Sequence, residues 1–449
     1  MSSDTLNTTA ASTPSVPFDW LPDADRDPHP RLTWLTECAF DVVVDTFYEK
    51  EEILPEGYKL EDGTLIISNH ERDSDVPVLT TTLCQRRGRF IRYQLPFYAS
   101  REDILRPGFL RELLLSLGWP EIIAWPAGWI PLRWLLRIVR AKPMRRVREF
   151  TLKEALDALC RAGLGDEDPR DWLRPSTIDE LQHRLRGEVP HTIIRLKRKR
   201  LGNYGRRFWG LRRLRPSALR RIAPDMRTTI NTQLKGFARL LDQGRCVYFA
   251  PEGTITDDGG MGRIRAGTLR LFRYARRNPT VLPVGLSYDF FERGRRRVVV
   301  NVGTPVQGLD SDTPRAFNKK LRDTLLSLRV ATVSHLLARY LSTAPDQFTV
   351  AELTEWMTRA RGALEENGIR LDPLLQRTTD MEELVRARLA WLSHHDLVSR
   401  AEDDVHWNNL WSRDKAPGRD PAWIDARHLK GAFDDWSKRF PGLADALKV

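Results

Sequence analysis

The sequence predicts an α/β fold, with a mainly parallel or mixed sheet flanked by helices and an α-helical C-terminal region. Over residues 60–305, short apolar runs typical of strands alternate with segments in which apolar residues recur at helical spacing. From residue 315 onward the helical spacing dominates. The chain has 449 residues, more than one typical domain, so we expect a second region appended to the α/β domain.

Turn and cap residues help to place the individual elements. Pro77 suits the first turn of a helix, and Gly244 suits the end of a helix that leads into a strand. The predicted elements are, in order, a helix within 30–50, a strand at 64–68, a helix at 76–87, a strand at Phe90–Leu95, an interrupted helical segment at 109–139, helices at 151–163 and 177–186 separated by a loop from Asp166 to Pro175, a helix at 228–243, a strand at 246–250, a helix at 267–276, strands at 280–288 and 296–302, and helices at 315–341, 350–366 and 380–396, with a short extended stretch near 397–407.

The chain carries a formal net charge of +12, so we expect its surface to bind an anionic partner. Phospholipid headgroups, a phosphorylated substrate, coenzyme A, an acyl-carrier protein and nucleic acid all fit this charge. The cysteines lack metal-binding spacing, which predicts a reducing compartment and no disulfide framework. Residues 1–16 lack a basic start and an apolar core, which predicts a disordered tail rather than a signal peptide.

No stretch of 18 uncharged apolar residues occurs, so no ordinary transmembrane helix is predicted. Residues 109–139 nevertheless combine short apolar runs with arginines and tryptophans, a composition typical of a segment that lies in the membrane interface. A tryptophan-rich core, or a wall of a substrate cleft, is the alternative. The tryptophans are Trp119, Trp125, Trp129 and Trp134.

Residues 69–75 place a histidine and an aspartate five positions apart, directly after the apolar run Leu65-Ile66-Ile67. A histidine that acts as a base needs an acceptor on its other ring nitrogen, because the acceptor fixes the tautomer and stabilises the imidazolium. Across a strand-to-helix turn, the Asp75 carboxylate can curl back to His70, with Asp73 as a competitor. A turn with a solvated carboxylate would have the same pattern.

A second apolar strand, Val247 to Phe249, leads into a turn with the sequence Pro251-Glu252-Gly253-Thr254. Proline sets φ, glycine permits backbone conformations closed to other residues, and Glu252 and Thr254 supply polar groups. Ligand chemistry in α/β folds lies at such carboxyl ends of strands. An ordinary strand-exit turn is the alternative.

In this order, the two segments resemble the glycerolipid acyltransferase family, which includes lysophosphatidate and glycerol-3-phosphate acyltransferases. The family's His-x4-Asp block matches His70 to Asp75, preceded by Ser68-Asn69. Its Phe-Pro-Glu-Gly-Thr block matches Phe249 to Thr254, with Ala250 inserted, and a later strand with a proline matches Val281-Leu282-Pro283-Val284. The resemblance covers roughly residues 45–305.

The resemblance implies a role for each matched residue. His70 would be the general base that takes the proton of the acceptor hydroxyl, oriented by Asp75, so no serine nucleophile is needed. The turn formed by Glu252, Gly253 and Thr254 would help to bind a glycerol-phosphate acceptor, with Gly253 letting backbone N–H groups approach. Glu252 itself is expected to hold a basic side chain or an acceptor hydroxyl, because a carboxylate would repel phosphate.

The family's second block supplies an arginine, and three positions compete for it. Residues 128–146 resemble that block's Ile-Pro helix, short strand and arginine, which indicates Arg146 or Arg145. Arg215 stands at the more usual distance before Glu252. An insertion of roughly 70 residues, at about 150–222, would reconcile Arg146 with that distance.

Further basic residues are candidates for anion binding. Arg263 and Arg265, just after the third block, could contact a phosphate, or they could lie in a solvated loop. The basic run at 195–221 could hold the phosphates of coenzyme A or membrane anions, or it could be a solvated face. Its aromatic residues would also fit a nucleic-acid site, although nucleic acid is not the partner that we expect.

These observations predict a disordered tail at 1–29, an acyltransferase domain at 30–309 and a helical C-terminal domain at 310–449. By resemblance, the function is transfer of a fatty acyl chain from acyl-CoA or acyl-carrier protein to a hydroxyl of a glycerol-phosphate or lysophospholipid. No metal or cofactor is expected, and the location would be cytoplasmic, at the inner face of an anionic membrane. The alternatives are an acyltransferase of the same fold with another alcohol or an amine as acceptor, and a non-catalytic basic protein that binds RNA or membranes.

Overall fold

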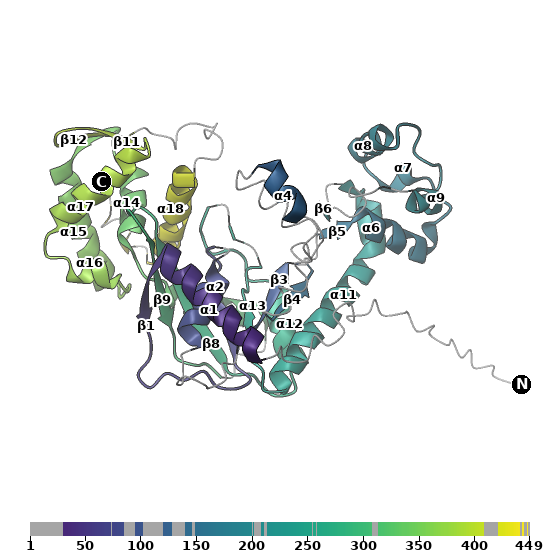
Figure 1. Cartoon of the computed structure of the whole chain (residues 1–449), viewed down its shortest axis with the longest axis horizontal. Coiled ribbons are helices and arrows are strands. Elements are labelled where there is room, and N and C mark those ends of the chain that lie inside the picture. The colour runs from purple at the N-terminus through teal and green to yellow at the C-terminus, as the bar shows by residue number, and fades with distance from the viewer. Residues whose placement is uncertain are drawn as a thin grey trace, which may run out of the picture. The chain divides into compact units, whose positions relative to one another are not determined.

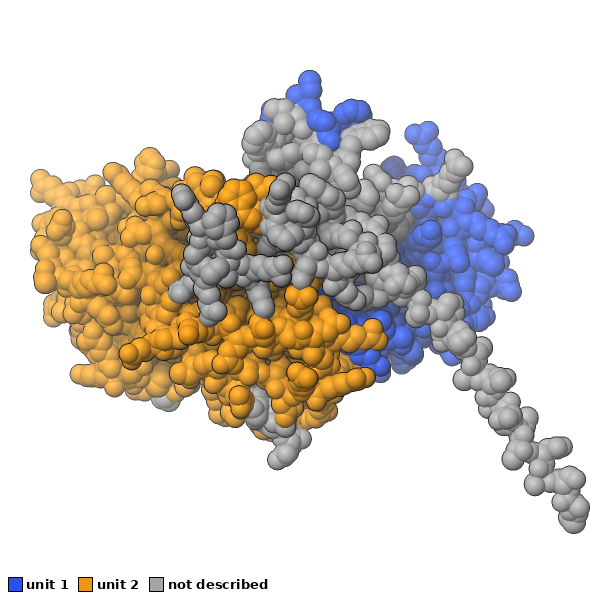
Figure 2. Space-filling view, turned by 60° about the horizontal axis from the view of Figure 1, so that its bottom comes forward, with its two compact units in different colours: residues 1–27, 100–133, 142–236 blue, residues 28–99, 134–141, 237–449 orange. Residues whose placement is uncertain are grey.

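The computed structural model describes residues 30–72, 74–84, 95–101, 120–127, 140–145, 149–199, 201, 208–210, 213–253, 255–256, 258–307, 313–407, 421–440, 442–443 and 447. The chain folds into two compact units, coloured separately in Figure 2. The first unit comprises residues 1–27, 100–133 and 142–236, and the second comprises residues 28–99, 134–141 and 237–449.

A mixed sheet is the centre of the fold, as the sequence predicts (Figure 1). Its seven described strands have the order β1-β9-β8-β2-β7-β3-β4. β2 runs parallel to both of its neighbours, β7 and β8, whereas β8 and β9 are antiparallel. The strands are β1 (Tyr48–Ile53), β2 (Leu65–Ser68), β3 (Phe97–Arg101), β4 (Ala141–Met144), β7 (Val247–Phe249), β8 (Val281–Asp289) and β9 (Arg296–Val302).

The central strands are buried along their whole length, which explains their apolar sequences. Every residue of β2, β7 and β8 is buried. Strands covered on both faces are near-continuously apolar rather than alternating. β2 lies between β7 and β8, so the residues after β2 and β7 leave the sheet at the same edge.

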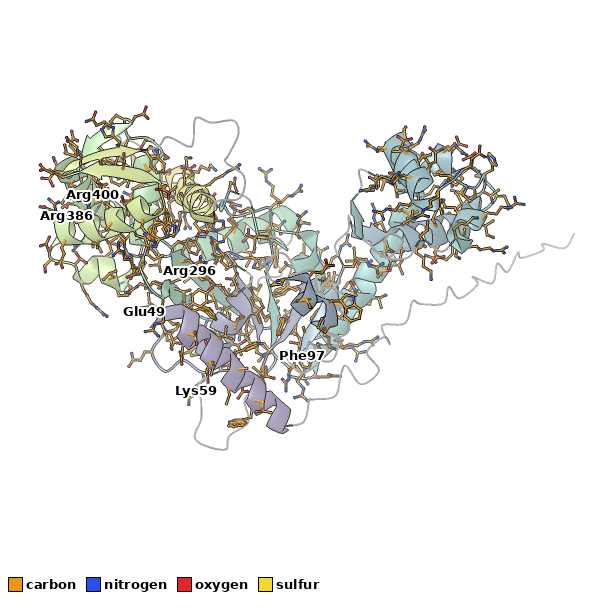
Figure 3. All side chains as sticks on the ribbon, turned by 45° about the horizontal axis from the view of Figure 1, so that its top comes forward. Glu49, Lys59, Phe97, Arg296, Arg386 and Arg400 are labelled. Carbon is orange, nitrogen blue, oxygen red and sulfur yellow. The ribbon has the colours of Figure 1, made fainter. Side chains whose placement is uncertain are left out.

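β1 is a strand that the sequence does not predict, because its residues are mostly charged. It pairs in parallel with β9, and its carboxylates meet an arginine of that strand. Arg297 lies 3.5 Å from Glu49 and 3.4 Å from Glu51. Figure 3 labels Glu49 of β1 and Arg296, the first residue of β9. β1 therefore forms an edge that is held partly by ion pairs.

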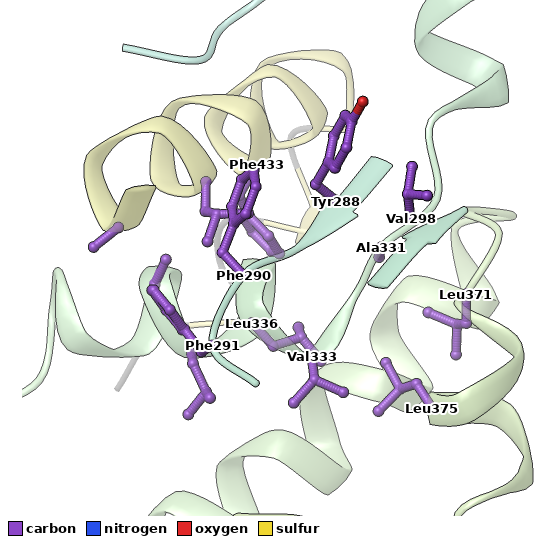
Figure 4. Packing of buried hydrophobic residues seen from close by; sticks show 14 of the residues in the cluster. Tyr288, Phe290, Phe291, Val298, Ala331, Val333, Leu336, Leu371, Leu375 and Phe433 are labelled. Atoms are coloured by element: carbon purple, nitrogen blue, oxygen red, sulfur yellow. The ribbon is translucent and has the colours of Figure 1, made fainter. Parts of the chain in front are cut away.

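The helices of the second unit pack around the sheet and continue into the C-terminal region. All of them except α12 (Ala266–Tyr274) and α13 (Pro314–Leu328) share one hydrophobic cluster with β8 and β9, part of which appears in Figure 4, including Phe290, Phe291 and Phe433. A small sheet with the order β10-β12-β11 completes this region. The elements are α1 (Pro30–Phe47), α2 (Asp75–Leu83), α12 (Ala266–Tyr274), α13 (Pro314–Leu328), α14 (Val333–Leu341), β10 (Gln347–Thr349), α15 (Val350–Glu366), α16 (Pro373–Arg377), α17 (Met381–His394), β11 (Val398–Ala401), β12 (Asp404–Trp407) and α18 (Pro421–Arg439).

The first unit has a separate hydrophobic cluster, built from residues between Leu152 and Met226. A capping box of Thr151 and Glu154 starts the helix at Leu152–Leu159. The elements are α4 (Glu121–Ala127), β5 (Glu149–Thr151), α6 (Leu152–Leu159), η3 (Cys160–Leu164), α7 (Pro169–Trp172), α8 (Pro175–Leu185), α9 (Ile193–Arg198), β6 (Phe208–Gly210) and α11 (Pro216–Asp242), the last of which extends into the second unit. This cluster covers the range where the sequence indicates an insertion.

Several predicted boundaries are wrong. α11 begins at Pro216 rather than 228, because the helix continues through Pro224. The predicted loop from Asp166 to Pro175 contains α7. The predicted helix at 315–341 is two helices, with a break at residues 329–332.

The second predicted strand lies mostly outside the described residues. Only Leu95 of Phe90–Leu95 is described, and it precedes β3, which spans Phe97–Arg101. Of the interrupted segment at 109–139, residues 120–127 are described, and they contain α4. Within the described parts of the chain, no helix is long and apolar enough to cross a membrane.

Candidate active site

The backbone after β2 is fixed by the side chain of Asn69, which is fully buried. Its Nδ2 donates to the carbonyl of Leu286 at 2.9 Å, and its Oδ1 accepts from the N–H of Leu286 at 2.8 Å. The asparagine thus extends the pairing between β2 and β8 by one residue. This anchor places the next residue, His70, at the carboxyl edge of the sheet.

His70 and Asp75 are in contact. The Nδ1 atom of His70 lies 2.9 Å from Oδ2 of Asp75. Asp75 is the first residue of α2 and is fully buried, whereas the His70 side chain is 23% exposed. The Asp75 carboxylate also accepts from the N–H groups of Glu71 and Arg72. The pair therefore has a buried orienting carboxylate and an imidazole that solvent can reach.

A tyrosine that the sequence does not single out also holds Asp75. The hydroxyl of Tyr288, on β8, donates to Oδ1 of Asp75 at 2.7 Å. Burial, reinforced by the Asp75 carboxylate, raises the pKa of Tyr288 well above its ordinary value, so its hydroxyl stays protonated and remains a donor. Each oxygen of the Asp75 carboxylate therefore has a side-chain partner, Tyr288 for Oδ1 and His70 for Oδ2.

Glu252 connects the loop after β2 to the loop after β7. Its Oε1 accepts from the N–H of His70 at 3.2 Å, and its Oε2 accepts from the N–H of Gly262 at 2.6 Å. The side chain is buried, and this burial raises its pKa above the ordinary value, against the opposing charge of Arg329. Both carboxylate oxygens therefore accept from backbone N–H groups.

The turn after Glu252 is exposed and has the conformation that glycine favours. Gly253 has a φ of +70°. The Nε of Arg265, at the N-terminal cap of α12, donates to the carbonyl of Glu252 at 3.1 Å. Gly253 and Arg265 are both exposed at this edge, whereas Thr254 lies outside the described residues.

Of the candidate arginines of the second block, the structure describes Arg145 and Arg215. Arg146 lies outside the described residues, directly after the short strand β4 and Arg145. Arg145 contacts Glu154 at 2.8 Å. Arg215 belongs to the first unit, where its Nε donates to the carbonyl of Leu173 at 3.1 Å.

A buried ionic cluster adjoins the candidate site. This cluster is not among the features that the sequence predicts. Glu71, the residue after His70, contacts Arg329 at 2.5 Å and His428 of α18 at 2.5 Å. Burial alone would raise the pKa of Glu71, but Arg329 and His428 hold it below its ordinary value. The sequence signal is polar residues at helical spacing in α18, namely Asp425, His428 and Asp435.

Chemically, the edge offers an oriented imidazole beside an exposed, glycine-containing turn. This arrangement suits proton abstraction from a hydroxyl that binds between the two loops. Among the described residues, no group of three or more His, Cys, Asp or Glu side chains is placed to hold a metal ion.

Comparisons with known proteins give little information about the function of these residues. No protein-family model and no curated protein matches the chain. Among solved structures, the chain is similar to the crystal structure of the 1-acyl-sn-glycerophosphate (LPA) acyltransferase PlsC from Thermotoga maritima, with 10% identity and a TM-score of 0.31. The match covers 66% of this chain and 75% of that chain. The functional assignment therefore depends on the residues of this chain.

Proposed function

We propose that the chain is an acyltransferase, which moves a fatty acyl chain from a thioester, acyl-CoA or acyl-carrier protein, to a hydroxyl of a glycerol-phosphate or lysophospholipid. The observation that carries the proposal is the contact of 2.9 Å between His70 Nδ1 and the buried Asp75 carboxylate. This pair lies at the carboxyl edge of the sheet, where the N–H of His70 also donates a hydrogen bond to the Glu252 carboxylate. The order of the matched sequence blocks gives independent support.

In the proposed reaction, His70 and Asp75 move one proton. The acceptor hydroxyl gives its proton to Nε2 of His70 while its oxygen forms a bond to the thioester carbonyl carbon. Asp75 stabilises the imidazolium that results. The carbon–sulfur bond then breaks, and the thiolate takes the proton back from His70. The products are an ester and a free thiol, and the imidazole is neutral again.

The acceptor is proposed to bind at the turn that follows Glu252. Glu252 sets the separation of the His70 loop and the Gly262 loop through its two backbone contacts. Gly253 is proposed to let backbone N–H groups approach the acceptor phosphate, and Arg265, which is exposed beside it, to supply positive charge. Thr254, with Arg146 or Arg215, completes the proposed set of binding residues.

The proposed location is cytoplasmic, at the inner face of an anionic membrane, because the acylated product is poorly soluble in water. Two observations support contact with a bilayer. The net charge is +12, and α1 exposes apolar side chains that include Trp34, Val42 and Phe47.

The test is a matrix of purified substrates. The full-length chain is incubated with acyl-CoA or acyl-carrier thioester and with glycerol-3-phosphate, a lysophospholipid, a neutral alcohol or an amine, and thiol release is measured with ester or amide formation. Transfer to a phosphorylated glycerolipid is the expected result. Transfer only to another alcohol or to an amine would reassign the acceptor, and no transfer in any pair would refute the proposal.

His70→Ala is the matched variant for this assay. We expect its kcat to fall by about 10²- to 10⁴-fold, the contribution of a positioned general base. Asp75→Asn should also lower kcat, because the amide no longer holds the tautomer that leaves Nε2 basic. Near wild-type turnover in His70→Ala would remove the base from the mechanism.

A further inference from the structure

The helix α18, far from the matched blocks in sequence, contacts both loops of the proposed active site. Asp425 forms an ion pair with Arg72, and His428 contacts Glu71. Asp435 accepts from the N–H of Met261, in the loop that follows the Glu252 turn. One helix thus holds Glu71 and Arg72, which follow His70, and also the loop that follows the Glu252 turn.

Arg329 joins these contacts into one buried cluster. Its guanidinium lies 2.5 Å from Glu71 and 3.3 Å from Asp435, and it donates to the carbonyl of Gly259 at 3.2 Å. The side chain is 3% exposed. Burial alone would lower the pKa of Arg329, but the carboxylates of Glu71, Asp435 and Glu252 raise it, so the guanidinium stays charged. An unpaired charge at such a site would be strongly destabilising, so the partners must remain in place.

The backbone of α18 also approaches the loop at 258–262 at glycine positions. A Cβ on Gly431 would overlap the carbonyl oxygen of Asp258, and a Cβ on Gly259 would overlap the carbonyl oxygen of His428. Gly259 also has a φ of +70°, which disfavours other residues. The helix and the loop therefore pack at a distance that only glycine permits.

We propose that α18 is a positioning element of the active site, one that sets the place of the His70 loop relative to the Glu252 turn. It acts on the first loop through Glu71 and Arg72 and on the second through Met261 and Gly259. Glu252 then couples the two loops by its contacts with the N–H groups of His70 and Gly262. This inference rests on the proposed function, because it assigns a role to α18 in that reaction.

The positioning role predicts a loss of turnover without a loss of donor binding. A displacement of about 1 Å at a reacting group can cost about a hundredfold in rate. Through Asp425, His428 and Asp435, α18 reaches the His70 loop and the loop that follows the Glu252 turn. Changes in α18 should therefore lower kcat and leave the KM for the thioester near its wild-type value.

The experiment compares Gly431→Ala with Gly362→Ala in the full-length chain. The added methyl at 431 forces α18 away from Asp258, whereas a Cβ at Gly362, in α15, meets no atom within 4 Å. We expect Gly431→Ala to lower kcat by about 10- to 100-fold. Amide hydrogen exchange in residues 69–75 should become faster, while exchange in β9 and the thioester KM stay unchanged. Gly362→Ala should behave as wild type.

A second pair covers the case in which Gly431→Ala does not fold. His428→Ala leaves a Glu71 oxygen without its partner, and His428→Gln restores an N–H donor of similar reach. We expect kcat to fall in the alanine variant and to recover in the glutamine variant. Wild-type kcat in His428→Ala, or no recovery in His428→Gln, would overturn the positioning role.

The two proposals fail in different ways. A wild-type chain that is inactive with every thioester and acceptor refutes the proposed function, and amide exchange in residues 69–75 still reports whether α18 holds that loop. An active wild type, together with a folded Gly431→Ala variant that keeps full kcat and unchanged exchange, refutes the role of α18 alone.

Discussion

The Asp75 carboxylate is the most constrained group of the candidate site. It is fully buried and is bound by His70, by Tyr288 and by the N–H groups of Glu71 and Arg72. A buried carboxylate needs such partners, because the loss of one leaves a lone pair without compensation for its lost hydration. The tyrosine should therefore matter for both stability and turnover.

Tyr288→Phe removes the hydroxyl donor at Oδ1 of Asp75 and keeps the ring, which stacks on Phe290. We expect the free energy of unfolding to fall by about 1–3 kcal/mol, since a buried charged acceptor loses a hydrogen bond. The kcat of acyl transfer should fall by about 10-fold or more, because Asp75 no longer orients His70 fully. Urea unfolding and steady-state kinetics measure the two effects.

Tyr58→Phe is the matched control, because among the described residues the Tyr58 hydroxyl is buried without a hydrogen-bond partner. Its removal should leave stability unchanged or raised. If Tyr288→Phe and Tyr58→Phe were equally stable and active, the hydroxyl of Tyr288 would have no role at Asp75.

Gly253 is the residue at which the acceptor side can be tested. Gly253→Val should raise the acceptor KM strongly and change the thioester KM less, because φ is +70° and a β-branched residue there would distort the turn. Equal losses for the donor and the acceptor would instead indicate general disruption. Arg146→Ala and Arg215→Ala belong in the same assay, and the variant that raises the acceptor KM identifies the arginine of the second block.

At the scale of elements, the start of α14 combines a helix cap with a buried histidine. Thr332 caps the helix, and the Nδ1 of His335 accepts from the N–H of Thr332 at 3.3 Å. Burial, together with Arg329 and His428 and against Glu71, lowers the pKa of His335 to about 3. This histidine is therefore neutral in the folded protein over a wide range of pH.

The depressed pKa of His335 predicts a loss of stability on mild acidification. The unfolded chain binds a proton near the ordinary value of 6.5, whereas the folded chain does so only near 3. The contribution of the neutral His335 to the free energy of unfolding is fully present above pH 6.5. It is lost as pH falls from 6.5 toward 3, at about 1.4 kcal/mol per pH unit. Urea unfolding at pH 7 and pH 5 measures it.

His335→Gln is the control for this titration, because glutamine at the third helical position can complete a capping box. The variant should lose less stability than the wild type between pH 7 and pH 5. A pH profile that is identical in both proteins would assign the acid sensitivity to other groups. The range above pH 5 also lies above the window in which Glu71, with its lowered pKa, adds a loss of its own.

Which elements the sequence predicts depends on how local their determinants are. β2, β7, β8 and β9 are predicted because each is an apolar run. β1 is missed because its charged residues are stabilised by Arg297 of another strand. The first half of α11 is missed because Pro224 normally ends a helix, and here the helix continues past it.

At the scale of the whole molecule, membrane binding is the property that remains to be measured. We expect the chain to sediment with anionic vesicles at low salt and to be partly released by high salt, because screening weakens the electrostatic share and leaves the apolar share. Neutral vesicles are the control. A chain that stays wholly in the supernatant with anionic vesicles at low salt would exclude a peripheral location.

Two double variants test which surface of the chain binds the vesicles. Trp34→Ser with Phe47→Ser alters α1, where these side chains are 56% and 60% exposed. Trp125→Ser with Trp129→Ser alters the segment at 109–139, in which Trp125 is 57% exposed and Trp129 lies outside the described residues. The set that reduces vesicle binding, with activity on a detergent-dispersed acceptor retained, identifies the bound surface.

The candidate site divides in the same way into local and distant parts. His70, Asp75 and Glu252 are found from the sequence because each follows a strand and stands in a recognisable order. Arg329 and His428 are not found, because their contacts with Glu71 span 258 and 357 residues of sequence. The polar residues at helical spacing in α18 indicate a polar helix face, but they do not indicate that Glu71 is the partner.

The long separation between Glu71 and His428 has a consequence for biosynthesis. A ribosome that adds about 5–20 residues per second needs on the order of tens of seconds to reach residue 428 after it has made residue 71. During that interval Glu71 lacks the helix that will hold it, as the contact spans 357 residues. A nascent or prematurely terminated chain would carry the His70 loop without its support. If α18 positions the His70 loop as proposed, catalytic competence would arrive only after α18 has been made, and shorter products would lack it.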